Sequence, residues 1–282
     1  MDKGSPITAI VLTLNEEQDL PRCLNSLTWC QKIVVVDSGS SDGTLAIARQ
    51  WNCDIYEHAW PGFADQRNWA LTQTRIETEW VLFVDADEVI TKELATEIHQ
   101  AIKNPAIAAY YVTFKVMLFG TWVKKSSHFP VWHPRLCRMG AVTFKNAITG
   151  HGETWDVLGR VGYLSAPYIH YCFSKGLTQW LYKHNRLSSM ECDAYFTSSY
   201  HTVENLKALF SRDLHKRRQA LRQLSFRLPG RPLLRFFYSY IVRWGFVEGR
   251  AGLVYCLLYL IYELMIQVKM IEKKTKIPRD HD

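Results

Sequence analysis

Apolar runs of strand length alternate with helical patterns through the first hundred residues. Residues 7–14 (ITAIVLTL) and 32–37 (KIVVVD) are apolar almost throughout, which is typical of strands buried on both faces of a sheet. Asn15 fits as the N-cap of the first helix, with Glu16 and Glu17 in its first turn. Strands alternating with helices predict βαβ units in a mostly parallel sheet flanked by helices. Strands are expected at 7–14, 32–37, 54–58 and 80–85, and helices at 16–27, 45–51, 63–74 (amphipathic) and 90–102.

The pattern changes from Ala109 onward. Three apolar stretches, at 109–120, 135–144 and 160–171, are separated by short turns and by no long helix. They predict strands at an antiparallel or mixed edge of the same sheet, with loops that build one side of a ligand site. A helical pattern returns at 174–192.

The C-terminal part of the chain differs in kind. Residues 205–227 alternate leucines with lysines and arginines, a basic amphipathic pattern suited to anionic lipid headgroups. Residues 233–247 and 251–270 are apolar and aromatic, and the second stretch is just long enough to span a bilayer. Glu263 within it argues against a spanning helix, so we expect helices in the membrane interface or re-entrant. Helices packed on the domain or on a second subunit fit the same pattern.

Composition narrows these interpretations. The chain has 282 residues, 48% of them hydrophobic, which suits one large domain or a domain with an appendage. Its net charge of +7 and its basic C-terminal part suggest an anionic partner surface. The seven cysteines show no CxxC pair and no zinc spacing, and residues 1–10 carry no secretion signal, so we expect a cytoplasmic location with reduced thiols.

Carboxylates stand directly after the buried run 80–84. Asp85 and Asp87 are separated only by the small Ala86, so both can reach one hard cation at the carboxyl end of a strand, where ligands bind in open α/β sheets. Oxygen ligands suit Mg²⁺ or Mn²⁺, which commonly bridge to a substrate's phosphates. An acidic turn that caps the next helix fits the stretch equally well.

A second acidic strand end is found at Asp37, before the turn SGSSDGT at 38–44. This carboxylate can accept a hydrogen bond from a nucleobase N–H or a ribose hydroxyl, and Gly39 and Gly43 let the backbone approach a ligand closely. A plain strand-to-helix turn, with Ser41 or Asp42 as N-cap, remains open. The chain contains neither GxxxxGK[ST] nor GxGxxG, so a P-loop or a dinucleotide fingerprint is not supported.

Three further residues are candidates by type and place. Arg67, in the predicted helix that precedes the acidic strand, could meet a phosphate or a base, or lie on the surface. Glu153, two residues before Trp155, could act as a general base with a raised pKa, or be a solvated loop acid. His170, at a strand end, could be an imidazole ligand or phosphate donor, or a core histidine.

Taken together, these motifs resemble the family 2 glycosyltransferases of GT-A fold. The matching pieces occur in the family's order: TLNEE at 13–17, VVVDSGSSDGT at 34–44, ADQRNWAL at 64–71 and FVDADE at 83–88. The later part resembles lipopolysaccharide-core β-glucosyltransferases, through HGE at 151–153, the His170 strand with its following helix, and GFVEGRAGL at 245–253.

The resemblance implies roles for these positions. Asp85 and Asp87 would form the family's Asp-x-Asp motif and hold Mg²⁺ or Mn²⁺ on the donor diphosphate, with His170 completing the metal shell. Asp37 would pair with the uracil ring, and Glu153 would take the place of the base that deprotonates the acceptor. Asp87 and Glu153 are thus the implied catalytic residues. The implied substrate-binding set is Thr13, Leu14, Asn15, Glu16, Asp37, Ser40, Arg67, Asn68, Asp85, Ala86 and Asp87.

The sequence therefore predicts a metal-dependent, inverting glycosyltransferase. We expect a GT-A catalytic domain at 1–200, with a nucleotide-sugar half (1–104) and an acceptor half (105–200), followed by a membrane-associating helical region at 201–282. The donor is expected to be a UDP-hexose such as UDP-glucose, and the acceptor a glycolipid or lipid-linked glycan at the cytoplasmic face of the inner membrane. A polyprenyl-phosphate glycosyltransferase and a non-catalytic membrane-bound module are the rival interpretations. Nucleic acid is not expected, because no aromatic stacking platform accompanies the basic residues.

Overall fold

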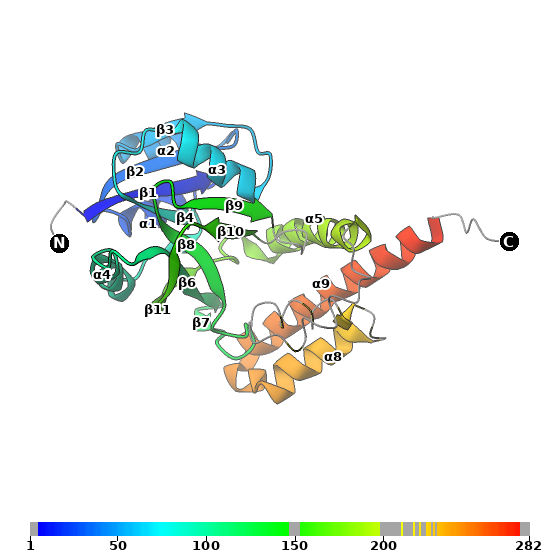
Figure 1. The fold of residues 1–282 in the computed structure, drawn as a ribbon. Helices are drawn as coiled ribbons and strands as arrows, with labels where there is room; N and C mark the ends of the chain where they lie inside the picture. The colour runs from blue at the N-terminus through cyan, green and yellow to red at the C-terminus, as the bar shows by residue number, and fades with distance from the viewer. Residues whose placement is uncertain are drawn as a thin grey trace. The chain divides into compact units, whose positions relative to one another are not determined.

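The computed structural model describes residues 5–146, 153–197 and 230–276, together with 210, 217, 220, 224–226 and 228 (Figure 1). Contacts divide the chain into two compact units. The first consists of 1–124, 128–147 and 152–177, and the second of 125–127, 148–151 and 178–282. Most of the helix that starts at Gly176 thus belongs to the second unit, whereas the sequence suggested a division near residue 200.

The first unit is built on a sheet that has nine strands among the described residues. Its first half is parallel, with the strand order β3-β2-β1-β4. Strands β1, β2 and β4 are rich in buried Val, Ile, Leu or Phe, and β3 pairs with β2 at the edge of the sheet. This is the arrangement that the alternating pattern predicts. The four strands are β1 (Ser5–Thr13), β2 (Cys30–Asp37), β3 (Asp54–Glu57) and β4 (Trp80–Asp85).

The second half of the sheet is mixed, as expected from the sequence. Strand β8 runs antiparallel to both of its neighbours, β4 and β6, while β11 returns parallel to β6 and pairs at its end with the short β5. A separate hairpin, β9–β10, packs through Phe144 and Trp155 on one face of the sheet. These strands are β5 (Glu88–Val89), β6 (Ile107–Leu118), β7 (Thr121–Trp122), β8 (Trp132–Arg138), β9 (Val142–Asn146), β10 (Glu153–Val157) and β11 (Arg160–His170).

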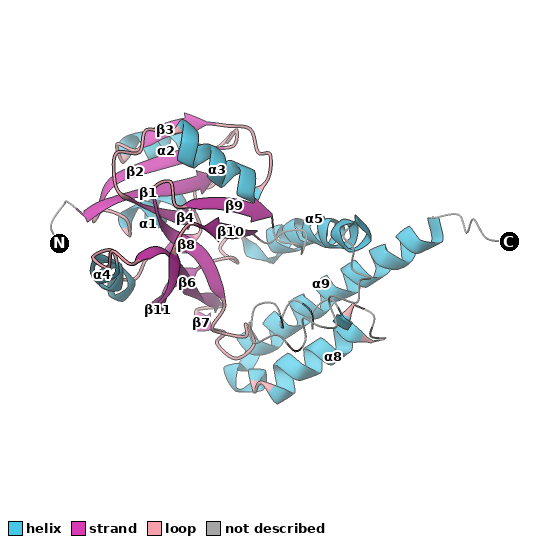
Figure 2. Ribbon diagram, in the orientation of Figure 1, coloured by secondary structure: helices cyan, strands magenta, loops and turns pink. Residues whose placement is uncertain are grey.

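Helices cover both faces of this sheet and enclose two apolar cores (Figure 2). One expectation was wrong: α3 is not an amphipathic helix in the usual sense, because its buried face carries Gln66 and Arg67 beside two alanines. A buried arginine and glutamine on a helix that faces the strand ends indicate a polar site there rather than core packing. The helices are α1 (Leu20–Asn25), α2 (Thr44–Gln50), α3 (Phe63–Gln73) and α4 (Lys92–Ala101).

The second unit is helical where it is described. Gly245–Thr275 is long and apolar enough to cross a membrane by length and composition, with 44% of its most apolar window buried. Most of the predicted basic helix at 205–227 lies outside the described residues. The elements are α5 (Gly176–Thr197), α8 (Arg231–Phe237), the π-helical turn η1 (Tyr238–Val242), the 3₁₀ turn η2 (Gly245–Glu248) and α9 (Gly249–Lys276).

Candidate active site

Asp85 lies between two buried arginines at the carboxyl end of β4. Its Oδ1 accepts a bond from Arg67 Nη2 at 3.0 Å, and its Oδ2 accepts one from Arg135 Nη2 at 2.9 Å. The two arginine side chains are only 1% and 3% exposed, whereas the Asp85 carboxylate is 34% exposed. Both carboxylate oxygens thus face guanidinium groups, and one edge of the side chain reaches solvent.

Asp87 and His170 meet at the same end of the sheet. The antiparallel pairing of β11 with β5 places His170 opposite Glu88, and the backbone N–H of Tyr171 donates to the Asp87 carbonyl at 2.9 Å. As a result His170 Nε2 lies 3.2 Å from Asp87 Oδ2. A carboxylate oxygen and an imidazole nitrogen at this separation can share a proton or face one divalent cation.

Glu88 anchors the arginine that orients Asp85. It is 1% exposed, accepts a bond from Arg135 Nη2 at 2.6 Å, and accepts another from the backbone N–H of Asp85 at 2.9 Å. Burial raises the pKa of Glu88, and the adjacent Arg135 opposes this effect. The buried Glu88 therefore fixes the loop between β4 and β5, in which Asp85 and Asp87 stay partly exposed.

The turn after β2 is organised around Asp37. Its carboxylate is completely buried and accepts four bonds: from Thr13 Oγ1, the backbone N–H groups of Gly39 and Ser40, and the Ser40 hydroxyl, at 2.5–2.9 Å. The predicted contact between Asp37 and uracil stays a prediction. In this geometry the carboxylate shapes the turn, and the exposed residues of the turn are Gly39 and Ser41.

Asn15 joins this turn to the end of β1, and the N-cap assignment made from the sequence was wrong. It has a left-handed backbone (φ 54°), and the cap position of α1 is Asp19. The Asn15 N–H donates to Ser40 Oγ at 2.8 Å, and its side-chain oxygen accepts from the Ser41 N–H at 2.8 Å. Asparagine tolerates this conformation better than most residues, which explains the residue type at this corner.

Glu16, next to Asn15, forms an ion pair with Lys175, a residue near the C-terminal end of the first unit. Its Oε1 lies 2.7 Å from Lys175 Nζ, which also donates to the Asn15 carbonyl at 2.6 Å. Burial raises the pKa of Glu16 to about 7, although Lys175 acts in the opposite direction. Leu14, beside it, is 46% exposed.

The substrate-binding role predicted for Asn68 stays a prediction, and in the structure its side chain binds the backbone of β9. The amide nitrogen donates to the Phe144 carbonyl at 2.9 Å, and the amide oxygen accepts from the Phe144 N–H at 2.8 Å. Both hydrogen-bonding ends of the amide are thereby used on the backbone of β9. Asn68 therefore ties α3 to the β9–β10 hairpin, which is the hairpin that begins its second strand at Glu153.

The backbone of Glu153 opens β10, paired with Asn146, and its side chain lies outside the described atoms. Its role as base stays a prediction. Ala86 is buried, 3% exposed, between the two aspartates of the loop. Among the described residues, no group of three or more His, Cys, Asp or Glu side chains has metal-binding geometry.

Comparison with known proteins identifies the family. The family model described as "Glycosyl transferase family 2" matches residues 8–160, more than half of the chain. The chain belongs to glycosyl transferase family 2. The family that the four N-terminal motifs indicated is therefore confirmed, together with the GT-A arrangement of a mixed sheet flanked by helices.

Relatives of this glycosyltransferase include two groups of bacterial proteins. The lipopolysaccharide core biosynthesis glycosyltransferase LpsC of Rhizobium meliloti is 39% identical over 94 residues, which are 32% of this chain and 34% of LpsC. An uncharacterized glycosyltransferase of Rickettsia felis is 26% identical over 281 residues, covering 96% of this chain and 91% of the relative. Among solved structures, S. aureus TarS 1–349 aligns over 98% of this chain and 93% of its own, with 16% identity and a TM-score of 0.46.

Sequence reasoning missed two residues of this glycosyltransferase site. Arg135 lies in β8, a strand that pairs antiparallel with β4, and Glu88, the last residue of FVDADE, was assigned no role. The stretch WHPRLCR gave no clear signal for Arg135, because it also contains His133 and a second arginine, Arg138. The partner of Arg135 could not be named without knowing which strand is the neighbour of β4.

Proposed function

We propose that this glycosyltransferase transfers a hexose from a UDP-sugar, with inversion and with the help of Mg²⁺ or Mn²⁺. The observation that carries the proposal is the meeting of Asp87 and His170, 3.2 Å apart, beside an Asp85 that is held by two arginines at the strand ends. Nucleotide ligands bind at this edge in open α/β sheets. The turn built on Asp37 and Asn15 lies on the adjacent strand ends, β2 and β1.

The donor set fits a divalent cation at Asp87 and His170. A carboxylate oxygen and a neutral imidazole nitrogen are ligands that Mn²⁺ accepts, and substrate phosphates and water supply the rest of such a shell. Asp85, whose two oxygens face Arg67 and Arg135, is the better candidate for orienting the nucleotide. When bound, the cation would stabilise the negative charge that develops on the departing diphosphate.

The chain's own groups would do the remaining work. An acceptor hydroxyl oxygen forms the bond to the anomeric carbon as the bond from that carbon to the diphosphate breaks, and the hydroxyl proton passes to the Glu153 carboxylate. One base is enough for this in-line displacement. Support for Glu153 comes from the family resemblance and from its place at the start of β10.

We further propose a glycolipid or lipopolysaccharide-core type acceptor at the cytoplasmic face of the inner membrane. LpsC, whose name gives it this role in core biosynthesis, supports the acceptor class over the 94 aligned residues. The apolar segment Gly245–Thr275 supports a location at a membrane.

Isothermal titration with UDP, with and without Mn²⁺, tests the donor and metal assignments. Wild-type protein should bind UDP only with Mn²⁺ present, and Asp87→Asn should weaken that binding at least tenfold. The matched control is Asp54→Asn, a carboxylate on β3 that pairs with Lys32. Absence of Mn²⁺-dependent UDP binding by the wild type would overturn the assignment.

Glu153→Gln separates the proposed acceptor from a polyprenyl phosphate. A sugar hydroxyl needs a base, so the variant should lose about 100-fold or more in kcat while its UDP affinity stays the same. A phosphate acceptor is already anionic, and with it the variant would keep most of its activity. Steady-state rates with membrane extract as acceptor distinguish the two outcomes.

A further inference from the structure

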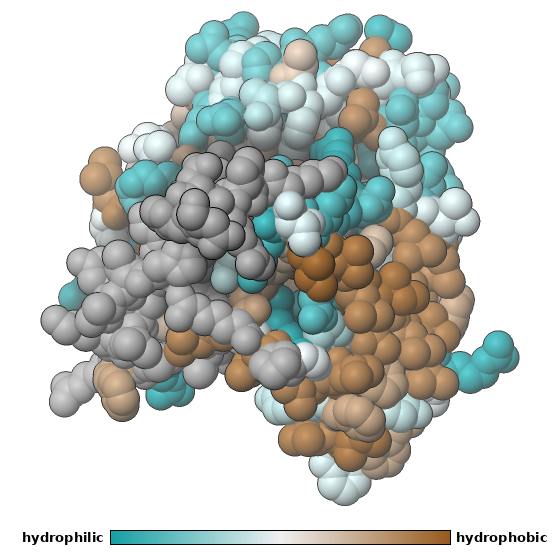
Figure 3. All heavy atoms as spheres, turned by 90° about the vertical axis from the view of Figure 1, so that its right-hand side faces the viewer, coloured by the Kyte–Doolittle hydropathy of each residue, from teal (hydrophilic) through white to brown (hydrophobic). Residues whose placement is uncertain are grey.

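Helix α9 presents a continuous apolar stripe to solvent. Six of its residues, spaced three or four apart and therefore on one face, are 36–62% exposed. The exposed apolar surface continues through α8, η1 and η2, where Phe237, Ile241 and Trp244 are 50–60% exposed. Figure 3 shows such a continuous brown area. An exposed apolar face of this extent marks a contact with another apolar phase or partner. The six α9 residues are Leu253, Leu257, Ile261, Leu264, Val268 and Ile271.

The charged residue in the middle of α9, Glu263, turns the other way, toward α8. Glu263 is 2% exposed. It forms ion pairs with Arg231, at 3.0 Å, and with Arg235, both on α8. The negative charge of Glu263, which argued against a spanning helix in the sequence, is therefore neutralised between α8 and α9 and does not lie on the exposed stripe.

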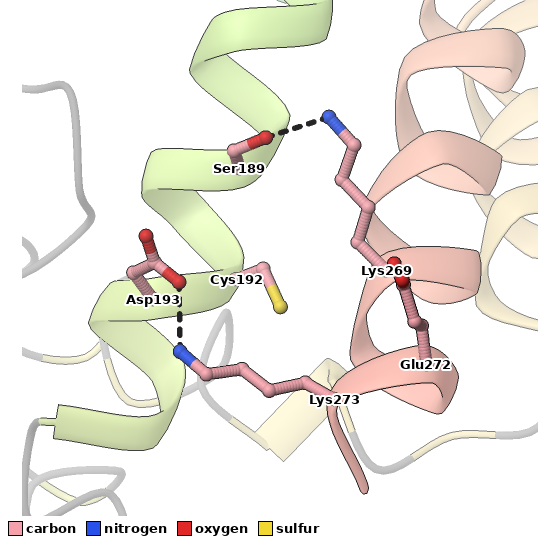
Figure 4. Close-up of a pocket in the computed structure, with 6 residues that line it drawn as sticks. All are labelled: Ser189, Cys192, Asp193, Lys269, Glu272 and Lys273. Atoms are coloured by element: carbon pink, nitrogen blue, oxygen red, sulfur yellow. Dashed lines mark hydrogen bonds and ion pairs between the residues drawn. The ribbon is translucent and has the colours of Figure 1, made fainter. Parts of the chain in front are cut away.

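Near its C-terminal end α9 is tied to α5 by polar contacts (Figure 4). Lys269 Nζ donates to the Ser188 and Ser189 hydroxyls at 2.7 and 2.8 Å and to the Asn185 side chain at 2.8 Å. Lys273 Nζ lies 2.7 Å from Asp193 Oδ1. One face of α9 is thus committed to two protein helices along most of its length.

These contacts are incompatible with a spanning position. α8 and η1 together run only from Arg231 to Val242, about 18 Å of helix against a hydrocarbon core of about 30 Å. The residues of α5 that hold Lys269 and Lys273 are polar or charged. If α9 crossed the bilayer, it would have to break these pairs or bring uncompensated charges into the hydrocarbon, both of which are costly.

The ends of α9 favour a lipid surface over a second copy of the chain. Arg250 in its first turn and Lys274 in its last are both exposed. With the helix lying in the membrane plane, both cations reach anionic headgroups of one leaflet. A two-fold pairing of two antiparallel stripes would bring Arg250 of one copy toward the last turn of the other, where Lys273 and Lys274 outnumber the exposed Glu272, so the two ends would carry net like charge.

We propose that the exposed stripe of α9, with α8, η1 and η2, forms a monotopic anchor that lies in the plane of an anionic bilayer. Trp244 and Tyr238, which are 60% and 46% exposed, would sit at headgroup depth. The proposal rests on the membrane location proposed above and adds its mode: insertion into one leaflet, with Glu263 kept inside the helical pair.

Flotation of the full chain with vesicles tests the surface. Wild type should float with vesicles of phosphatidylcholine and phosphatidylglycerol (about 70:30) and at least tenfold less with phosphatidylcholine alone. The triple variant Leu257→Ser, Leu264→Ser, Val268→Ser should lose at least tenfold in binding, while Leu158→Ser, at a leucine of the first unit that is even more exposed, should not. Circular dichroism melting confirms that each variant is folded.

Labelling from outside sealed vesicles tests the in-plane mode. A cysteine placed at exposed Thr275 should react with an impermeant maleimide as fully as one placed at Leu158, read by mass spectrometry of the labelled peptides. Flotation with Thr275→Cys protected would leave the membrane location standing and overturn the in-plane anchor. Failure of the wild type to float would overturn both. A dimer in solution that the triple variant abolishes would assign the stripe to a second copy instead.

Discussion

Single residues in this site are fixed by partners that are distant in sequence. Asp85 depends on Arg67, 18 positions before it, and on Arg135, 50 positions after it. Glu88 in turn holds Arg135 from below. The orientation of one carboxylate toward the proposed nucleotide thus rests on a buried chain of alternating charges, and the free energy of unfolding should be sensitive to each member.

Arg135→Met is expected to destabilise the protein by about 3 kcal/mol, because it leaves Glu88 buried without its cation. The double variant Arg135→Met, Glu88→Gln should recover part of this loss, since it removes the uncompensated charge. Urea denaturation measures both. Arg75→Met, at a side chain that is 78% exposed, is the control and should change stability by less than about 0.5 kcal/mol.

Glu16 makes stability depend on pH in a predictable direction. Its pKa is about 7 in the folded protein, against the ordinary glutamate value of 4.5 in the unfolded chain, so the unfolded chain loses the proton first as pH rises. The free energy of unfolding should therefore fall between pH 4.5 and 7 and level off above. Glu16→Gln should remove about 2 kcal/mol of this fall. The variant should therefore be more stable relative to wild type at pH 8 than at pH 5.

Urea denaturation at the two pH values provides the comparison, with exposed Glu57→Gln as control. If wild type and Glu16→Gln lose the same stability between pH 5 and pH 8, the burial of a protonated Glu16 is wrong.

At the scale of elements, local patterns predicted more than pairing. The four parallel strands and their helices could be predicted because the apolar pattern of each lies within its own short stretch of sequence. The order β4-β8-β6-β11 does not, because no local signal says that β8 inserts between β4 and β6. For the same reason the carboxylates at 85 and 87 were found from the sequence, whereas Arg135 was not.

Asn68 joins α3 to the β9–β10 hairpin, and the loss of this contact can be measured directly. Asn68→Ala removes both hydrogen bonds to Phe144 and leaves backbone groups of β9 without these partners, at a cost of about 1–3 kcal/mol. Amide hydrogen exchange should rise in β9 and β10, and kcat should fall if Glu153 is the base. Gln73→Ala, exposed at the end of the same helix, should leave exchange in the hairpin unchanged.

At the scale of the whole molecule, the second unit is closed by a tight crossing of η2 and α9. A Cβ on Gly252 would lie 2.1 Å from the backbone carbonyl oxygen of Gly245. Gly252→Ala should therefore destabilise this unit by about 2 kcal/mol, where glycine to alanine in an open helix usually stabilises. Thermal melting gives the sign, with Val268→Ala on the exposed face as the near-neutral control.

The same unit takes in three residues from far earlier in the chain. The backbone N–H of Ser126 donates to Glu248 at 3.1 Å and its hydroxyl does so at 2.5 Å, and the N–H of Lys125 donates to the same carboxylate. During synthesis these donors leave the ribosome 122 or 123 residues before their acceptor. The helical unit must therefore be completed last, around a loop already carried by the growing sheet, and it could not be exchanged between relatives as a contiguous cassette.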